Sequence, residues 1–350
     1  MSPTRKTSPR RKPLSLASFN LAEQLRGVAD SVEQGSWPHT GRHFSFPILS
    51  GHLGGFHDSL YVLAGASRMG KTTFALQMAF GLLRENPDTH VLFVSLDQPS
   101  RDLNLRLVAM AGEAMVDYVA HPDPLMEEKY ERKREIGMRL TMDLASRLTV
   151  VDESLGALSM DEIRAFVDEK RGEFDGPLVL FLDPLYKVRV GGITEFAERG
   201  DVLAQELKTL CMSQKVGVMG TTRLAHGAGR RRPSLEDLEE QPGLLYEAQA
   251  IMLFYCDYFN NGDTPFLEWE WGTDDLMVPV CELNLAKNKM GGFAGRLYYR
   301  FYNSFSKFKE CPQLEIDNYE RMLRNLQQHD PTDPTPDDSK FQRVEVIDET

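Results

Sequence analysis

The stretch "LAGASRMGKTTFALQMAF", Leu63 to Phe80, is the most informative part of this 350-residue chain for its fold. Its glycine, lysine and threonine residues fit the spacing G-x-x-x-x-G-K-[ST], which is typical of a phosphate-binding loop. In such a loop backbone amides surround the phosphates, the lysine reaches the outer ones and the threonine hydroxyl contacts magnesium. The predicted loop comprises Gly65, Ala66, Ser67, Arg68, Met69, Gly70, Lys71, Thr72 and Thr73.

The segments on both sides of the loop have the character that this motif needs. "SLYVLAG" (59–65) is a short apolar run with β-favouring residues, which predicts a buried strand leading into the loop. After the loop, Phe74, Met78 and Leu82 recur at helical spacing, so the free amides of that helix's first turn would point at the anion. A chance glycine-rich turn before an amphipathic helix is the alternative. Four fixed positions and both flanks favour a nucleotide site instead.

The composition excludes several classes of protein. A formal net charge of -12 argues against a uniformly basic nucleic-acid coat, although it leaves room for a local basic channel. The four cysteines lie far apart without a C-x-x-C pair, which indicates neither a zinc site nor a disulfide framework and favours a reducing, cytoplasmic setting. No apolar run approaches the length of a membrane span, and the N-terminus lacks the apolar segment of a secretory signal, so we expect no membrane partner.

The segments at the two ends of the chain differ in composition from its centre. Residues 1–19 are predicted to be a disordered basic arm, either a solvated tail or a contact for nucleic acid or lipid. Residues 20–43 are predicted to hold a short linker helix and a lead-in, and the helix's apolar stripe could dock on its own core or on a neighbouring subunit. Residues 311–350 turn acidic and rich in proline and aspartate, so we expect a largely flexible tail.

Between these segments, residues 44–310 form a predicted α/β domain. Strands and helices alternate along it, which favours a mostly parallel sheet covered by helices on both faces. Two late segments, 278–288 and 295–303, surround a glycine turn and predict an antiparallel hairpin at the end of the sheet. The other predicted strands are His90–Asp97, Arg147–Glu153, Pro177–Asp183, Lys215–Thr222 and Ala248–Cys256.

Two aspartates end apolar strands at the edge of the sheet where the loop is expected. Asp183 ends "PLVLFLD" and is predicted to reach the magnesium shell beside Thr72, with an aspartate that merely starts the next turn as the alternative. Asp97 ends "VLFVSLD" and is the candidate for polarising an attacking water. Its alternative role is to cap the helix that begins near "QPSRDLNLRL".

Three cations are further candidates for the site. Arg223, in "GTTRLAH", follows another strand end and could sense the outermost phosphate, or it could be a surface cation that pairs with an acid. Lys287 and Lys289, in "AKNKMGG", occupy alternate positions of a strand and so share one face. They would be solvated lysines in a monomer, whereas in a ring they could stabilise transition-state charge at the neighbour's nucleotide.

The order of these segments, from Phe44 to Phe308, resembles the C-terminal motor domain of the DnaB-type replicative DNA helicases, which are RecA-like P-loop ATPases. "SRMGKTTFALQMA", "VLFVSLDQPSRDLNLRL" and "LTVVDESLGALSMDEIRA" resemble the family's phosphate loop and its next two strand–helix segments. "LVLFLDPLYKV" resembles the metal-binding strand, and "ELKTLCMSQKVGVMGTTRL" the sensor helix and strand. "DLEEQPGLLYEAQAIMLF" and "LAKNKMGGFAGRLYYRFYNSFSKF" match the last segments in order and spacing.

The resemblance implies an ATP-dependent helicase or translocase. It implies a homo-oligomeric ring, usually of six subunits, with ATP and Mg2+ between neighbours, single-stranded DNA through the middle, and proteins of replication or of a mobile element as possible partners. Lys71 and Thr72 take the phosphate and magnesium roles, and Asp183 takes the metal-side acid. The family's separate N-terminal domain is expected to be absent, because only about forty residues precede the core.

Several residues depart from the pattern that the resemblance implies. Asp97 stands where the family usually has a catalytic glutamate, Arg223 where it has a sensor glutamine, and Lys289 where it has a finger arginine. A lysine cannot offer phosphate the planar fork of an arginine. In the DNA-facing loop, Glu239 replaces an arginine and Pro242 a glycine, so a carboxylate faces phosphodiester and an amide hydrogen is lost.

A nearby arginine cluster could restore contact with DNA. "HGAGRRRPS" carries Arg230, Arg231 and Arg232 on a glycine-bearing loop, which predicts either a DNA contact or a solvated loop. Two functions therefore stay open. The first is a ring motor on single-stranded DNA, and the second is a RecA-like ATPase that regulates or recruits a partner without unwinding.

Overall fold

The computed structural model describes residues 21–33, 41–123, 125–225, 228, 231–238, 241–259, 267–271 and 274–328. Helix α1 (Leu21–Glu33) belongs to a separate unit, residues 1–40, and its Leu21 and Leu25 are exposed. The predicted basic arm, residues 1–19, and the end of the predicted tail, residues 329–350, lie outside the described residues.

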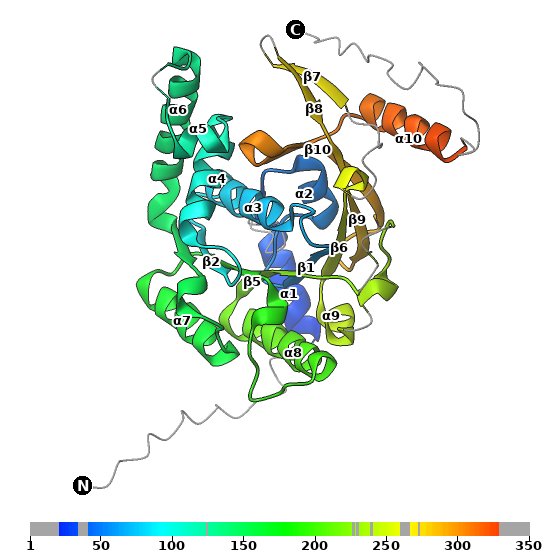
Figure 1. Cartoon of the computed structure of the whole chain (residues 1–350). Coiled ribbons are helices and arrows are strands. Elements are labelled where there is room, and N and C mark those ends of the chain that lie inside the picture. Colours follow the sequence, from blue (N-terminus) through cyan, green and yellow to red (C-terminus); the bar gives the residue numbers. More distant parts are fainter. Residues whose placement is uncertain are drawn as a thin grey trace. The chain divides into compact units, whose positions relative to one another are not determined.

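A sheet of nine strands in the order β11-β10-β9-β6-β1-β5-β4-β2-β3 forms the centre of the second unit, residues 41–350 (Figure 1). The six strands from β6 to β3 are parallel, and β9, β10 and β11 continue the sheet antiparallel. The predicted mostly parallel sheet and its C-terminal hairpin, β9–β10, are therefore confirmed. The strands are β1 (Leu60–Gly65), β2 (His90–Ser95), β3 (Leu148–Val151), β4 (Leu178–Asp183), β5 (Val216–Thr222), β6 (Ala250–Tyr255), β9 (Val280–Asn288), β10 (Gly295–Tyr302) and β11 (Lys307–Glu310).

Helices cover both faces of the sheet because successive strand residues point to opposite sides. In β1, Tyr61 and Leu63 belong to one apolar cluster, and Leu60 and Val62 belong to the other. The first cluster lies against α2 (Pro47–Leu53), α3 (Lys71–Glu85) and α4 (Ser100–Gly112), and the second against α7 (Met160–Glu173), α8 (Phe196–Gln214) and α9 (Pro242–Glu247).

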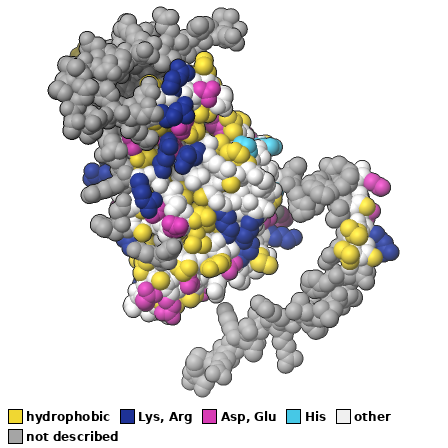
Figure 2. Space-filling model, turned by 90° about the vertical axis from the view of Figure 1, so that its right-hand side faces the viewer, with side chains coloured by type: hydrophobic (Ala, Val, Ile, Leu, Met, Phe, Trp, Pro, Cys, Tyr) yellow, Lys and Arg dark blue, Asp and Glu magenta, His cyan; other side chains and the backbone are white. Residues whose placement is uncertain are grey.

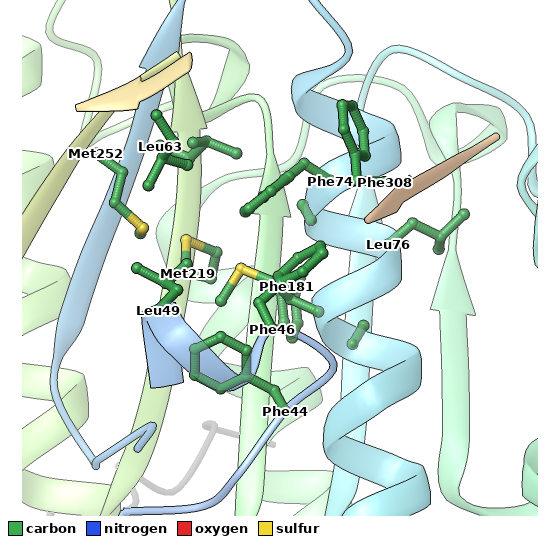
Figure 3. Close-up of a cluster of buried hydrophobic side chains, with 14 of the residues drawn as sticks. Phe44, Phe46, Leu49, Leu63, Phe74, Leu76, Phe181, Met219, Met252 and Phe308 are labelled. Atoms are coloured by element: carbon green, nitrogen blue, oxygen red, sulfur yellow. The ribbon is translucent and has the colours of Figure 1, made fainter. Parts of the chain in front are cut away.

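Aromatic packing in the first cluster fixes the helix that follows the loop (Figure 3). The ring of Phe74, in the first turn of α3, stacks on Phe46 with centroids 4.3 Å apart. It also meets Phe308 of β11 edge-on at 5.4 Å. Stacked and edge-on aromatic pairs stabilise a fold by more than the burial of their surface area alone. These contacts hold the first turn of α3 against the residue that precedes α2 and against β11.

Two more helices, α5 (Val116–Ala120) and α6 (Glu128–Leu144), follow α4 on the face of the sheet that α2, α3 and α4 cover. Helix α6 crosses α4 at a pair of glycines, Gly112 and Gly137. A Cβ atom on Gly137 would lie 2.2 Å from the carbonyl oxygen of Val108, so only glycine permits this close crossing. None of the helices in the described ranges is long and apolar enough to cross a membrane.

The C-terminal segment differs from the flexible tail predicted from residue 311. Residues Gln313–Gln328 form helix α10, whose Tyr319 is buried and lies edge-on to Tyr298 at 6.0 Å. The composition that predicted flexibility begins only after this helix, at residue 330. A separate antiparallel ribbon, β7 (Leu267–Trp271) with β8 (Asp274–Val278), was also not predicted.

Candidate nucleotide-binding site

The loop between β1 and α3 has a backbone that its glycines make possible. A Cβ atom on Gly65 would lie 2.9 Å from the carbonyl oxygen of Phe254, so the last residue of β1 must be small. Gly70 has a φ of 90°, in the region that favours glycine, and Arg68 has a φ of 66°. The segment with these positive φ values ends at Gly70, and α3 begins at the next residue, Lys71. The loop therefore lies at the N-terminus of a helix, where free amides attract anions.

The side chain of Lys71 folds back across the loop. Its Nζ donates a hydrogen bond to the carbonyl oxygen of Ala66 at 2.7 Å. Burial lowers the pKa of Lys71 to about 8, while the charges of Asp183 and Asp97 oppose this shift. A phosphate group beside Lys71 would favour its charged form in the same way. The loop thus presents a partly buried cation where the outer phosphates are expected.

Asp183, at the end of β4, is a buried carboxylate with one unsatisfied oxygen. The hydroxyl of Thr221 donates to Oδ1, and the Thr72 hydroxyl lies close enough to lower the carboxyl's pKa. Burial has the larger effect and raises the pKa of Asp183. Oδ2 is buried and has no hydrogen-bond partner within the described ranges. An unpaired carboxylate oxygen beside a hydroxyl is a donor set that suits Mg2+, and these two residues would hold the ion.

Asp97 lies at the same edge of the sheet as Asp183. Ser95 of β2 pairs with Asp183 in register, and the amide of Leu96 donates to the carbonyl oxygen of Asp183 at 2.7 Å. The negative charge of Asp97 raises the pKa of both Lys71 and Asp183. The structure thus brings the two predicted aspartates and the predicted lysine together.

The alternative role of Asp97, as a helix cap, is filled by another residue. Helix α4 begins at Ser100, whose amide donates to Oδ2 of Asp152 at 2.8 Å. Asp152 follows β3, and hydrogen bonds from Ser154 and Ser100 lower its pKa well below the usual range. Asp97 instead forms an ion pair with Lys187, a residue that the sequence did not indicate.

Arg223 follows β5 and is held by aromatic rings. Its guanidinium carbon lies 4.7 Å from the ring centre of Phe196 and 5.3 Å from that of Tyr186. Among the described residues, Arg223 contacts these two rings and forms no ion pair with an acid, which the surface alternative would require. The side chain that meets the end of β5 is Gln241, which accepts from the Thr222 hydroxyl at 2.9 Å and donates to the Arg223 carbonyl oxygen at 3.4 Å.

Lys287 and Lys289 share one face of their strand, but they lie away from Lys71 of their own chain. The main-chain amide of Lys289 donates to the carbonyl oxygen of Gln249, directly before β6. Strand β6 runs parallel to β1, and the phosphate loop follows the last residue of β1, so the loop lies at the opposite end of these strands. That separation is about five strand residues, roughly 16 Å. Both ammonium groups donate to the carbonyl oxygen of Tyr246, near the end of α9, at 3.2 and 3.0 Å. Burial, with Lys289 nearby, lowers the pKa of Lys287 to about 8.

Two arginines of the predicted DNA loop are paired with acids of the same chain. Arg231 donates to both oxygens of Asp237, at 2.7 and 3.0 Å. Arg232 donates to Glu282 of β9 at 2.7 Å and to Glu320 of α10 at 3.2 Å. These contacts would compete with DNA phosphates for the same donors. Arg230 and Glu239 lie outside the described residues, and Pro242 is the first residue of α9, where its missing amide hydrogen costs nothing.

Comparison with known proteins gives one consistent picture. Residues 41–310 match the family model described as the DnaB-like helicase C terminal domain. The chain is 28% identical over 324 residues to the replicative DNA helicase DnaB of Rickettsia typhi, covering 85% of this chain and 62% of that protein. The replicative DNA helicase DnaB of Rickettsia prowazekii is 28% identical over 286 residues, which cover 74% of this chain and 56% of that protein.

A solved structure of a DnaB-like replicative helicase, determined to describe its interactions with primase, agrees on the fold. It aligns with a TM-score of 0.68 at 20% sequence identity, covering 83% of this chain and 66% of that chain. A second solved structure, of an ATPase domain, aligns with a TM-score of 0.71 at 19% identity, covering 84% of this chain and 99% of that domain. The chain spans roughly three fifths of the length of the curated relatives it matches, so the activities of those whole proteins do not transfer directly.

Proposed function

This chain belongs to the family of DnaB-like helicase C-terminal domains, and on that basis we propose that it hydrolyses ATP to drive movement on single-stranded DNA. The observation that carries the proposal is the buried Oδ2 of Asp183, which lacks a partner within the described ranges. The Asp183 carboxyl group lies close to the hydroxyl of Thr72, in the first turn of the helix that follows the phosphate loop. This arrangement supports a Mg-nucleotide site.

The residues of the site divide the work of ATP hydrolysis among them. The loop amides and Lys71 bind the phosphates, and Lys71 exchanges its bond to Ala66 for a phosphate oxygen. Thr72 and Asp183 would hold Mg2+, and the ion would supply positive charge that offsets the charge of the outer phosphates. Asp97 orients the attacking water and accepts its proton.

The proposed assembly is a homo-oligomeric ring, usually of six subunits, with ATP between neighbours. The position of Lys289 supports this, because the lysine lies at the sheet edge opposite its own phosphate loop and could stabilise charge only at another subunit's nucleotide. Figure 2 shows several Lys and Arg side chains close together along the left of the described surface, so local basic surface exists despite the net negative charge.

The chain would act in the cytoplasm with proteins of replication or of a mobile element.

A second function is favoured by the ion pairs of the arginine loop. Arg231 and Arg232 are bound to Asp237, Glu282 and Glu320, so these donors contribute little to DNA binding unless the pairs break. The chain would then be an ATPase that regulates or recruits a partner without unwinding DNA.

One experiment separates these functions. ATP turnover is measured with and without single-stranded DNA, for the wild type and for Lys71→Ala, alongside strand separation on a forked duplex. The motor predicts Lys71-dependent turnover that DNA stimulates, together with strand separation. Turnover that needs Lys71 but ignores DNA, without strand separation, would establish the regulatory ATPase. Turnover that is independent of Lys71 would exclude both.

A further inference from the structure

The side chain of Lys187 bridges the ends of two strands that carry a candidate carboxylate at, or two residues after, their last residue. Lys187 follows Asp183 of β4 by four residues, and Asp97 follows the end of β2. The Lys187 Nζ donates to Oδ1 of Asp97 and, at 2.9 Å, to the carbonyl oxygen of Leu96. The lysine therefore holds both the side chain of Asp97 and the main chain beside it.

The main chain of Lys187 has little freedom. Lys187 ends a single helical turn, η4 (Leu185–Lys187), in which its amide donates to Pro184 at 3.3 Å. Two residues close to it in the chain, Leu185 and Val188, are each only 1% exposed and belong to the second apolar cluster. The base of the lysine side chain is thus fixed relative to Asp183, which begins this segment.

The Asp97 side chain, by contrast, depends on Lys187 for its orientation. Its main chain lies in a turn that is closed by Ser95, whose hydroxyl donates to the Gln98 carbonyl oxygen at 2.8 Å. The Asp97 side chain is 52% exposed, and within the described ranges Lys187 is the one residue that donates to its carboxylate. Only Oδ1 is used, so Oδ2 is left to accept from a water molecule. A short exposed carboxylate without a donor would sample several rotamers.

We propose that Lys187 is a positioning residue for ATP hydrolysis, which holds the Asp97 carboxylate at a fixed place relative to the metal-side acid Asp183. The inference rests on the function proposed above, because it requires Asp97 to act on the attacking water. Displacing a reacting group by about 1 Å can cost roughly 100-fold in rate, so the bridge matters even though Lys187 itself touches no substrate. The side chain acts on turnover and leaves nucleotide binding to the loop and Lys71.

The test is a double-mutant cycle of Lys187→Met and Asp97→Asn, in the full chain. Lys187→Met should lower kcat by about 10- to 100-fold and leave the affinity for a fluorescent ATP analogue within about 2-fold of wild type. Lys187→Arg should recover part of kcat, because the guanidinium can also donate to the carboxylate. In the Asp97→Asn background, Lys187→Met should change kcat by less than about 2-fold, since the residue acts through Asp97.

The matched control is Lys170→Met, which removes a lysine from a surface ion pair with Glu173 in α7 and should leave kcat unchanged. A Lys187→Met variant that turns over ATP as fast as wild type, or faster, would overturn the proposal, as would an equal loss in the Asp97→Asn background. Normal turnover by Asp97→Asn would overturn the role of Asp97 in the proposed function as well. An inactive Asp97→Asn with a normal Lys187→Met would overturn the positioning role alone.

Discussion

Replacing Arg232 by Met should destabilise the domain far more than a typical surface change. Arg232 pairs at 2.7 Å with Glu282, whose side chain is only 3% exposed, so the substitution leaves a buried carboxylate without its main partner. Breaking such a pair costs about 3–5 kcal/mol. Arg296, with Nε 3.6 Å from the other carboxylate oxygen, remains and compensates in part. We therefore expect a loss near the lower end, about 3 kcal/mol, in the free energy of unfolding.

The measurement is urea unfolding of the wild type, Arg232→Met, and the double variant Arg232→Met/Glu282→Gln. The double variant should recover most of the stability, because the buried charge is removed along with its partner. Arg164→Met is a matched control. It removes an arginine that is paired with the exposed Asp161 and the partly exposed Glu206, and it should cost less than about 1 kcal/mol.

The same variants decide whether Arg232 also binds DNA. If the residue contacts a phosphate, the stable double variant should bind single-stranded DNA more weakly, and its slope of log K against log salt should fall by about 0.7. The structure predicts no such change. An Arg232→Met variant as stable as wild type that also shows the weaker salt dependence would refute the structural assignment and restore the DNA-binding prediction.

Three further predictions concern the subunit interface, the helix crossing and pH. If Lys289 acts on a neighbour's nucleotide, mixing Lys289→Ala subunits with Lys71→Ala subunits should change ATP turnover non-linearly with the ratio, and a strictly additive response would remove the shared site. Gly137→Ala should lower the free energy of unfolding in urea by about 1–3 kcal/mol, because α4 and α6 must separate; Gly172→Ala, in open space on α7, should be neutral or slightly stabilising. The pKa of Lys287 is lowered in the folded state to about 8, so its protonated form is disfavoured by folding. The stability of wild type relative to Lys287→Met should therefore fall as pH drops from about 10 to 8 and level off below 8, and a constant difference in urea titrations would contradict this.

Local patterns were sufficient to predict the scaffold of the site. The motif from Gly65 to Thr72 is local in the sequence. It predicts a strand before the loop and a helix after it, and the structure has β1 and α3 there. Because parallel strands end at one edge of a sheet, two apolar runs ending in Asp97 and Asp183 were enough to predict that these carboxylates lie near Lys71. The two-residue period of a strand likewise predicted that Lys287 and Lys289 face the same way.

The partners of those charged groups could not be predicted in this way. Asp97 meets Lys187 from ninety positions away, and Arg232 meets Glu320 from eighty-eight, on a helix that composition had assigned to a flexible tail. Such pairs depend on which elements pack together and on how deeply a carboxylate is buried. No regular pattern in the sequence predicts either property. Motif spacing and apolar periodicity were thus enough to predict the fold and the elements that form the candidate nucleotide site. The packing of distant segments settles which cations remain available for the nucleotide or for DNA, because each ion pair needs two side chains brought within a few ångströms.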